Sequence, residues 1–100
     1  MSFMLDETLS IHEKLEHLIY FLQYIGNVLK EESVELKEET LKLKKQFKNI
    51  DYENGSLFTY FRVISLIQNH ANSFDIPLSV FSLDDFKPDI LLVDKTDQNN

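Results

Sequence analysis

The chain has 100 residues and a mass of 11.8 kDa, which predicts a single domain. Asp and Glu number 17 and Lys and Arg number 10, so the net charge of −7 argues against a general nucleic-acid binder and against binding to an anionic membrane surface. The absence of cysteine excludes disulfides, iron–sulfur clusters and thiolate zinc sites. With 2 Gly and 2 Pro, the chain has few breakers, which favours long helices and a mainly α fold.

The first predicted helix begins near residue 7 and extends to residue 31. Ser10-Ile-His-Glu13 has the form of a capping box, and Asp6 is a competing N-cap one turn earlier. From there, large aliphatic residues recur at spacings of 4 and 3, which is the pattern of a heptad seam. The residues of this seam are Ile11, Leu15, Leu18, Leu22, Ile25 and Leu29.

This helix is apolar around most of its circumference between residues 18 and 29, so it needs cover on more than one side. It is either the central helix of the domain or part of an oligomer interface. The residues that we predict for such an interface are Leu15, Leu18, Tyr20, Leu22, Tyr24 and Leu29.

A second helix is predicted over 33–49. One line of the seam continues through Leu36 and Leu43, but the other line becomes Glu32, Glu39 and Gln46. Glutamates come first in this segment and lysines follow, which complements the dipole of a separate helix. One continuous helix of about 40 residues is the alternative that the spacing leaves open.

Asn54-Gly55 is the clearest turn signal in the chain. It predicts a turn over 51–56, followed by a third helix over 56–74 with Ser56 as its N-cap. In the alternative interpretation, the same dipeptide closes a β-hairpin that pairs 41–47 with 57–67.

The C-terminal segment changes character at Pro77, because the residue before a proline avoids the helical region. A short helix is expected over 79–86, and the apolar run 90–93 is expected to be a strand or an extended packing arm. Residues 95–100 are expected to be a disordered tail. The predicted fold is therefore a single helical domain over 1–94, a three-helix antiparallel bundle with a C-terminal arm.

Two histidine–glutamate pairs form the densest group of metal-ligand side chains. His12 and Glu16 are four residues apart, as are Glu13 and His17, so each pair shares a helix face. The order H-E-x-x-E-H is not the zinc-protease motif, and all four residues lie off the seam, which favours a solvated helix face over a metal site. Neither a Gly-rich phosphate loop nor a nucleophile pattern occurs, so we expect no enzyme activity and no cofactor.

These exclusions and the acidic charge predict a small regulator that occupies a basic surface of a partner protein, in the manner of an inhibitor, an immunity protein or a chaperone or adaptor. The alternatives are a structural homo-oligomer, such as a coiled-coil dimer built on the first helix, and a metal-binding helical protein that uses His12/Glu16 and Glu13/His17. We expect a cytoplasmic protein, because the N-terminus lacks a basic signal region and no apolar run reaches the roughly 18–20 residues of a membrane span. The predicted contact residues of the acidic surface are Glu31, Glu32, Glu35, Glu38, Glu39, Asp51 and Tyr52.

Overall fold

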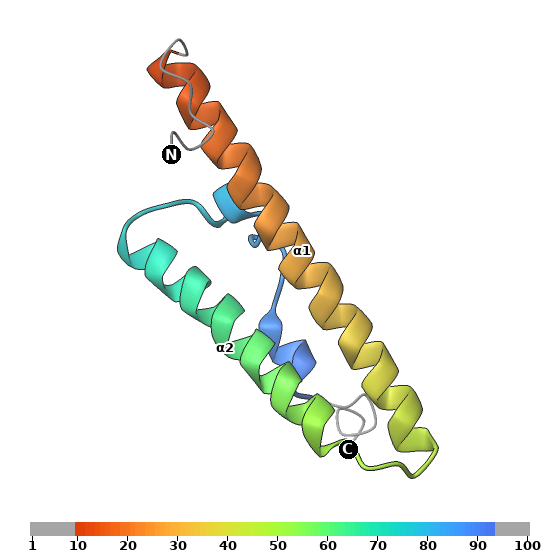
Figure 1. Cartoon of the computed structure of the whole chain (residues 1–100). Coiled ribbons are helices and arrows are strands. Elements are labelled where there is room, and N and C mark those ends of the chain that lie inside the picture. Colours follow the sequence, from red (N-terminus) through yellow and green to blue (C-terminus); the bar gives the residue numbers. More distant parts are fainter. Residues whose placement is uncertain (1–9, 94–100) are drawn as a thin grey trace.

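The computed structural model describes residues 10–93 and is mainly α, as the composition predicts. Two long helices, α1 (Ile11–Lys45) and α2 (Asp51–Ser73), run antiparallel, and two short 3₁₀ helices follow, η1 (Leu78–Phe81) and η2 (Pro88–Leu91) (Figure 1). No strand occurs between residues 10 and 93. The β-hairpin alternative is therefore wrong, because both of its expected strands lie in helices.

Helix α1 is continuous, so the predicted break between 31 and 33 is wrong and a three-helix bundle is not confirmed. Ser10, one of the two N-caps that the sequence left open, caps the helix, and its hydroxyl accepts a hydrogen bond of 3.1 Å from the Glu13 amide. Ser33, the expected start of a second helix, is instead buried in mid-helix. Its hydroxyl donates a 2.9 Å hydrogen bond to the carbonyl of Lys30, so the side chain is satisfied without interrupting the helix. The predicted start near residue 7 lies outside the described residues.

Small residues form the most buried line of α1. Gly26, Ser33 and Thr40 are the buried residues of this helix, and they are spaced seven apart. The Thr40 hydroxyl donates a 2.7 Å hydrogen bond to the carbonyl of Leu36. Together with the half-buried leucines of the seam, this line makes a two-sided seam that continues along the second half of α1. The residues of this seam are Gly26, Leu29, Ser33, Leu36, Thr40 and Leu43.

The turn between α1 and α2 lies at 46–50, before the predicted one. Phe47 adopts a left-handed conformation with φ of 58°, and the amides of Phe47 and Lys48 donate to the carbonyls of Lys44 and Leu43. This is a Schellman-type helix end. The predicted turn at 51–56 is wrong, since Asn54 and Gly55 lie within α2, where the amide of Asn54 already donates to the carbonyl of Ile50.

The third predicted helix, 56–74, is thus one turn longer at its start. The amide of Asp51 donates a 2.8 Å hydrogen bond to the side-chain oxygen of Asn49, which satisfies one free amide at the beginning of α2. Ser56, the expected N-cap, is an ordinary residue of the helix.

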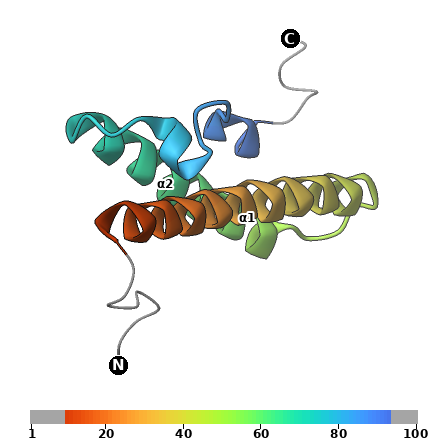
Figure 2. The ribbon, with the colours of Figure 1, turned by 90° about the horizontal axis from the view of Figure 1, so that it is seen from above.

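The C-terminal segment, residues 76–93, packs on one side of the helix pair (Figure 2). Its first part, η1, lies mainly against α1, and η2 lies mainly against α2. The short helix predicted over 79–86 is confined to Leu78–Phe81, and the strand or extended arm predicted over 90–93 is wrong because its first half belongs to η2. The fully buried core combines the C-terminal segment with α2 and consists of Leu57, Ile64, Leu83 and Leu91.

Polar contacts fasten the C-terminal segment to both helices. The Gln68 amide donates to the carbonyls of Leu83 and Phe86, at 3.1 and 2.8 Å. On the other side, Lys30 forms a 3.1 Å ion pair with Asp85. The amide nitrogen of Gln68 thereby satisfies two carbonyls of irregular backbone that no helix ladder reaches.

The molecule is elongated, with principal extents of 57 × 28 × 16 Å and a radius of gyration of 17.3 Å. A compact domain of 100 residues has a radius of gyration of about 13 Å. The long axis follows α1, whose 35 residues form the longest element and whose N-terminal part projects past the end of α2 and past the C-terminal segment (Figure 1). Among residues 10–93, no helix combines the length and the hydrophobicity that crossing a membrane requires.

Candidate interaction surface

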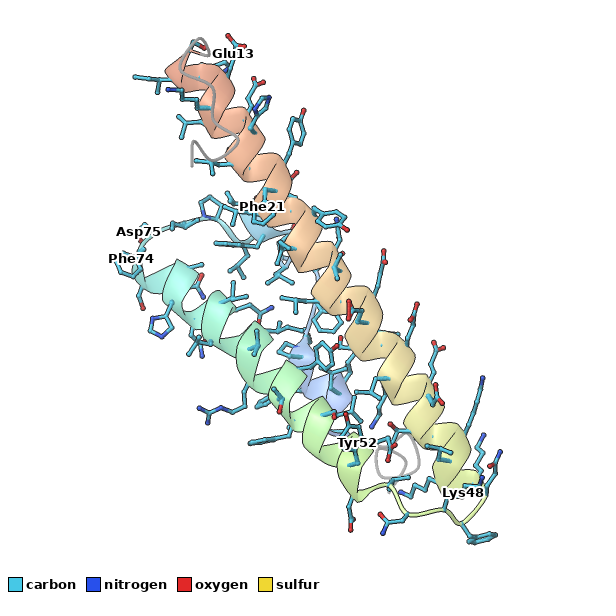
Figure 3. The ribbon with its side chains drawn as sticks, viewed as in Figure 1. Glu13, Phe21, Lys48, Tyr52, Phe74 and Asp75 are labelled. Atoms are coloured by element: carbon cyan, nitrogen blue, oxygen red, sulfur yellow. The ribbon has the colours of Figure 1, made fainter. Side chains whose placement is uncertain are left out.

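The first three turns of α1, residues 11–22, form an exposed projection that we call the arm. Ile11 is 78% exposed and Phe21 is 56% exposed. Leu15, Leu18 and Ile19 are also exposed, although large aliphatic side chains are normally buried. Figure 3 shows side chains around the turns near Glu13 with no described helix beside them, and η1 comes alongside α1 only near Phe21.

The apolar residues of the arm lie on one broad face. With Leu15 at heptad position a, the core positions a and d hold Ile11, Leu15, Leu18 and Leu22, and the flanking positions e and g include Ile19 and Phe21. Ile19 and Phe21 therefore extend the apolar a/d seam on both of its flanks. The opposite positions b, c and f hold Glu13, Glu16, His17 and Tyr20.

The arm ends where the C-terminal segment reaches α1. At Gly26 the backbone of Phe81 approaches the helix so closely that its carbonyl oxygen occupies the space of a β-carbon. Three residues earlier, the Gln23 side chain donates a 3.4 Å hydrogen bond to the carbonyl of Ser79. From this point onward, the chain covers α1 with its own residues.

The two faces of α1 do not coincide. In the arm the second line of the seam is Ile11, Leu18 and Ile25, which all remain exposed. Continued by sevens, that line reaches Glu32 and Glu39, both exposed. The buried line of the second half is instead Gly26, Ser33 and Thr40. The intramolecular core therefore shares the leucine line of Leu22, Leu29 and Leu36 with the arm but lies on one flank of it. The line on the other flank, which begins with Ile11 and Leu18, has no partner in the described part of the chain.

The structure divides the residues that we predicted for an oligomer interface into two faces. Leu15 and Leu18 lie exposed on the apolar face of the arm, and Leu22 and Leu29 are half-buried at and beyond its base. Tyr20 and Tyr24 are exposed as well, but helical spacing places them on the polar face.

The acidic residues predicted to contact a partner are also exposed. Glu31, Glu35, Glu38 and Glu39 lie along the outer side of α1. Glu32 differs, because it accepts a 3.3 Å hydrogen bond from the Tyr60 hydroxyl of α2. Burial of the Tyr60 hydroxyl, followed by the nearby Glu32 charge, raises the pKa of Tyr60.

Asp51 and Tyr52 belong to the other helix. Both are exposed in the first turn of α2, next to the loop that follows α1 (Figure 3). Asp51 and Tyr52 therefore do not continue the line of glutamates on α1, although they are close to it in the sequence.

Of the two histidine–glutamate pairs, His12 and Glu16 are in direct side-chain contact. His12 Nε2 lies 2.8 Å from Glu16 Oε1, and both side chains are exposed. Glu13 and His17 are exposed on the same part of the helix. Between residues 10 and 93, no group of three or more His, Asp or Glu side chains is arranged to hold a metal ion. In this arrangement, a metal ion bound at either histidine–glutamate pair would have only the two side chains of that pair as protein ligands.

A groove of about 640 Å³ lies between α2 and the C-terminal segment. Polar side chains such as Arg62, Asn69 and Asp89 contribute to its wall, together with Gln68, whose amide nitrogen is already bonded to two carbonyls. The groove thus follows the contact between α2 and the C-terminal segment.

Sequence reasoning missed the small-residue line and the buried Leu91. The heptad pattern of large apolar residues does not include Gly26, Ser33 and Thr40, because these residues are small and two of them are polar. Their own spacing of seven was the signal that would have located the packed face of α1.

No family model, no curated protein and no solved structure matches the chain.

Proposed function

We propose that this protein is a non-enzymatic interaction module whose binding element is the arm. The observation that carries the proposal is the broad apolar face of residues 11–22, which projects beyond the rest of the molecule. An amphipathic helix with anchors at spacings of 3 and 4 is suited to packing against the helices or into the groove of another chain.

The size of the exposed apolar surface supports this role. Isolated exposed leucines are common, whereas a contiguous apolar patch on a projecting helix marks an interaction site. Fully burying one such side chain contributes about 1.5–3 kcal/mol. The four side chains at core positions, Ile11, Leu15, Leu18 and Leu22, therefore provide a large driving force for association.

Site-specific photocrosslinking tests the proposal. A photoreactive phenylalanine analogue is placed at Leu18 on the apolar face and, in a matched control, at Tyr20 on the polar face. In the organism that encodes the protein, the Leu18 probe is expected to form a defined adduct with a second polypeptide and the Tyr20 probe is not. Equal crosslinking from both positions, or none from Leu18, would contradict the proposal.

The acidic surface is a second candidate, in which the partner carries a basic surface. Because α1 is one helix, an exposed tyrosine and exposed glutamates follow each other along its outer side. Complementary charges accelerate association, and tyrosine is enriched among the residues that contribute most to binding. We call this line the acidic ridge, and its residues are Tyr24, Glu31, Glu35 and Glu38.

Charge reversal tests the acidic ridge. The same photoreactive group at Glu35 is expected to capture a basic protein, and the additional changes Glu31→Lys and Glu38→Lys should abolish this adduct while circular dichroism shows unchanged helicity. The matched control reverses Asp51 and Glu53 on α2. An adduct that survives reversal of the ridge would exclude this candidate.

The more specific roles of inhibitor, immunity protein, chaperone or adaptor remain predictions from charge and size, as do the metal-binding alternative and the cytoplasmic location.

A further inference from the structure

We infer that the partner of the arm is a second copy of this chain, packed antiparallel, so that two arms form a symmetric dimer. This inference rests on the proposed function of the arm and identifies what covers it. Three features support a second copy as the partner: the charge of the arm, the spacing of its apolar residues, and the position of the C-terminal segment on α1.

The charge of the arm permits self-association. The whole chain has a net charge of −7, but residues 11–22 contain two glutamates and one lysine and have a net charge of −1 with neutral histidines. Two arms thus meet with little mutual repulsion. The acidic residues from Glu31 to Glu39 lie farther along α1, outside the proposed contact.

The spacing of the core residues is the same in both directions. Ile11, Leu15, Leu18 and Leu22 are separated by 4, 3 and 4 residues, and the reversed sequence has identical separations. An antiparallel copy therefore places Ile11 opposite Leu22 and Leu15 opposite Leu18. Each pair joins an a position to a d position, which is how layers form in antiparallel coiled coils.

The flanking positions also fit this arrangement. Antiparallel helices bring e next to e and g next to g, so His12 lies near Ile19 of the second copy and Lys14 lies near its Phe21. No like charges face each other at these positions. The methylene groups of Lys14 and the ring of Phe21 extend the apolar contact on one flank.

A parallel copy does not fit, because the chain itself covers α1 beyond the arm. Phe81 lies against Gly26, and the C-terminal segment continues along the helix from there. In a parallel pair, the two C-terminal segments and the two α2 helices would compete for the same space. In the antiparallel pair, the two bodies lie at opposite ends of the paired arms, which gives a closed twofold dimer.

Mass measurement over a dilution series from about 1 to about 100 µM is the first test. The full chain should weigh twice 11.8 kDa at the upper end. Leu15→Glu with Leu18→Glu should weaken association by about 100-fold or more, because four charges then enter the apolar contact. The matched control, Tyr20→Glu, makes a comparable change on the polar face and should leave the dimer intact. A monomer throughout, or a dimer insensitive to the arm variant, overturns the inference.

Cysteine crosslinking tests the orientation and uses a chain without native cysteine. Ile11→Cys and Leu22→Cys are made separately, so that oxidation of each alone should give no dimer and oxidation of the mixture should give a disulfide-linked heterodimer. A parallel pair would instead link each variant to itself, because identical positions would then lie within the roughly 7 Å that a disulfide allows between α-carbons. Self-linked products overturn the antiparallel arrangement, even if the glutamate variant fails to fold.

These results separate the inference from the proposed function. If the Leu18 photoprobe captures a different protein while the purified chain stays monomeric, the second copy is excluded and the arm remains an interaction element. A photoproduct linked within one chain would show that the protein covers its own arm, which overturns both.

Discussion

The carbonyl oxygen of Phe81 occupies the position at which a β-carbon on residue 26 would stand. Gly26 is buried on α1, and Phe81 is the last residue of η1, so this contact is where the C-terminal segment meets the long helix. Glycine is required here by close approach rather than by backbone dihedral angles, since its φ is not positive.

Gly26→Ala is therefore expected to destabilise the protein by about 1–3 kcal/mol, because the methyl group forces η1 away from α1 and this outweighs the better helix propensity of alanine. Gly55→Ala is the matched control. Gly55 also lies in a helix, but a β-carbon added there would have no neighbouring atom within 4 Å. Alanine should therefore stabilise α2 by about 0.5–1 kcal/mol. Urea unfolding at one fixed protein concentration measures both changes. Equal effects of the two substitutions would show that η1 does not rest on Gly26.

Ser33→Leu should destabilise the protein by about 1–3 kcal/mol, because Ser33 is fully buried and faces the packed side of the helix pair. Ser33→Ala should cost less than about 1 kcal/mol, since the lost hydroxyl bonds only to the carbonyl of Lys30 in its own helix. Thermal unfolding monitored by circular dichroism compares the two. If leucine proved as stable as alanine, the break that the sequence suggested near Ser33 would regain support.

Gln68→Ala is expected to loosen the C-terminal segment. The substitution removes two hydrogen bonds and leaves the carbonyls of Leu83 and Phe86 without their donor, at about 1–3 kcal/mol for each group that water does not reach. Amide hydrogen exchange should accelerate around Leu83 to Leu91 more than within α1. Gln23→Ala removes a longer and more exposed bond to Ser79 and should have a smaller effect. Uniform acceleration across the molecule would argue against a local role of Gln68.

The ion pair between Lys30 and Asp85 makes stability depend on pH. The hydrogen bond from Lys30, followed by its positive charge, lowers the pKa of Asp85. A carboxyl whose pKa is lower in the folded state contributes stability above its unfolded pKa, and this contribution disappears as pH falls through the folded pKa. Asp85→Asn should therefore be less stable than the natural protein at neutral pH.

That difference should shrink as the pH falls below the ordinary range of an aspartate, and it should also shrink with added salt, because the Asp85 side chain is 74% exposed. Urea unfolding at neutral and acidic pH measures it. A difference that persists at acidic pH would assign the effect of the substitution to packing.

Phe47→Gly should stabilise the protein by about 0.5–1 kcal/mol. Phe47 has a left-handed backbone conformation, which is unfavourable for a residue with a β-carbon, and its side chain is 97% exposed. Glycine removes the strain without removing a buried contact, although its greater freedom in the unfolded chain offsets part of the gain. Phe47→Ala retains the strained conformation and should change stability little. A loss of stability in the glycine variant would show that the Phe47 ring has a contact partner.

The amino-acid pattern was sufficient for the mainly α class and for the face of the arm. Few glycines and prolines predicted a mainly α fold. The capping box of Ser10 and Glu13, which was one of two candidate starts, lies at the beginning of α1. The aliphatic heptad from Ile11 to Leu22 predicted a helix face, and that face is apolar and exposed in the structure. These features are local, because they depend on capping and on side chains one turn apart.

Tertiary packing decided where α1 ends, which side of it is buried, and where the C-terminal segment goes. The change from acid to base suggested two helices, yet Ser33 lies buried within one, because a small side chain that bonds to its own helix permits close packing. Asn54-Gly55 suggested a turn, yet both residues continue α2. The apolar run at the end of the chain suggested a strand or a packing arm, but which of its residues enters the core depends on η2 placing Leu91 with Leu57 and Ile64.

The sequence by itself thus determined the secondary structure class and the apolar face of residues 11–22, because both arise from neighbours along the chain. Only the tertiary structure showed that this face stays uncovered within residues 10–93. The small residues at 26, 33 and 40 direct the packing of α2 and the C-terminal segment to one flank of the leucine line of α1, whereas Ile11 and Leu18 lie on the other flank. No local pattern of hydrophobicity records that choice.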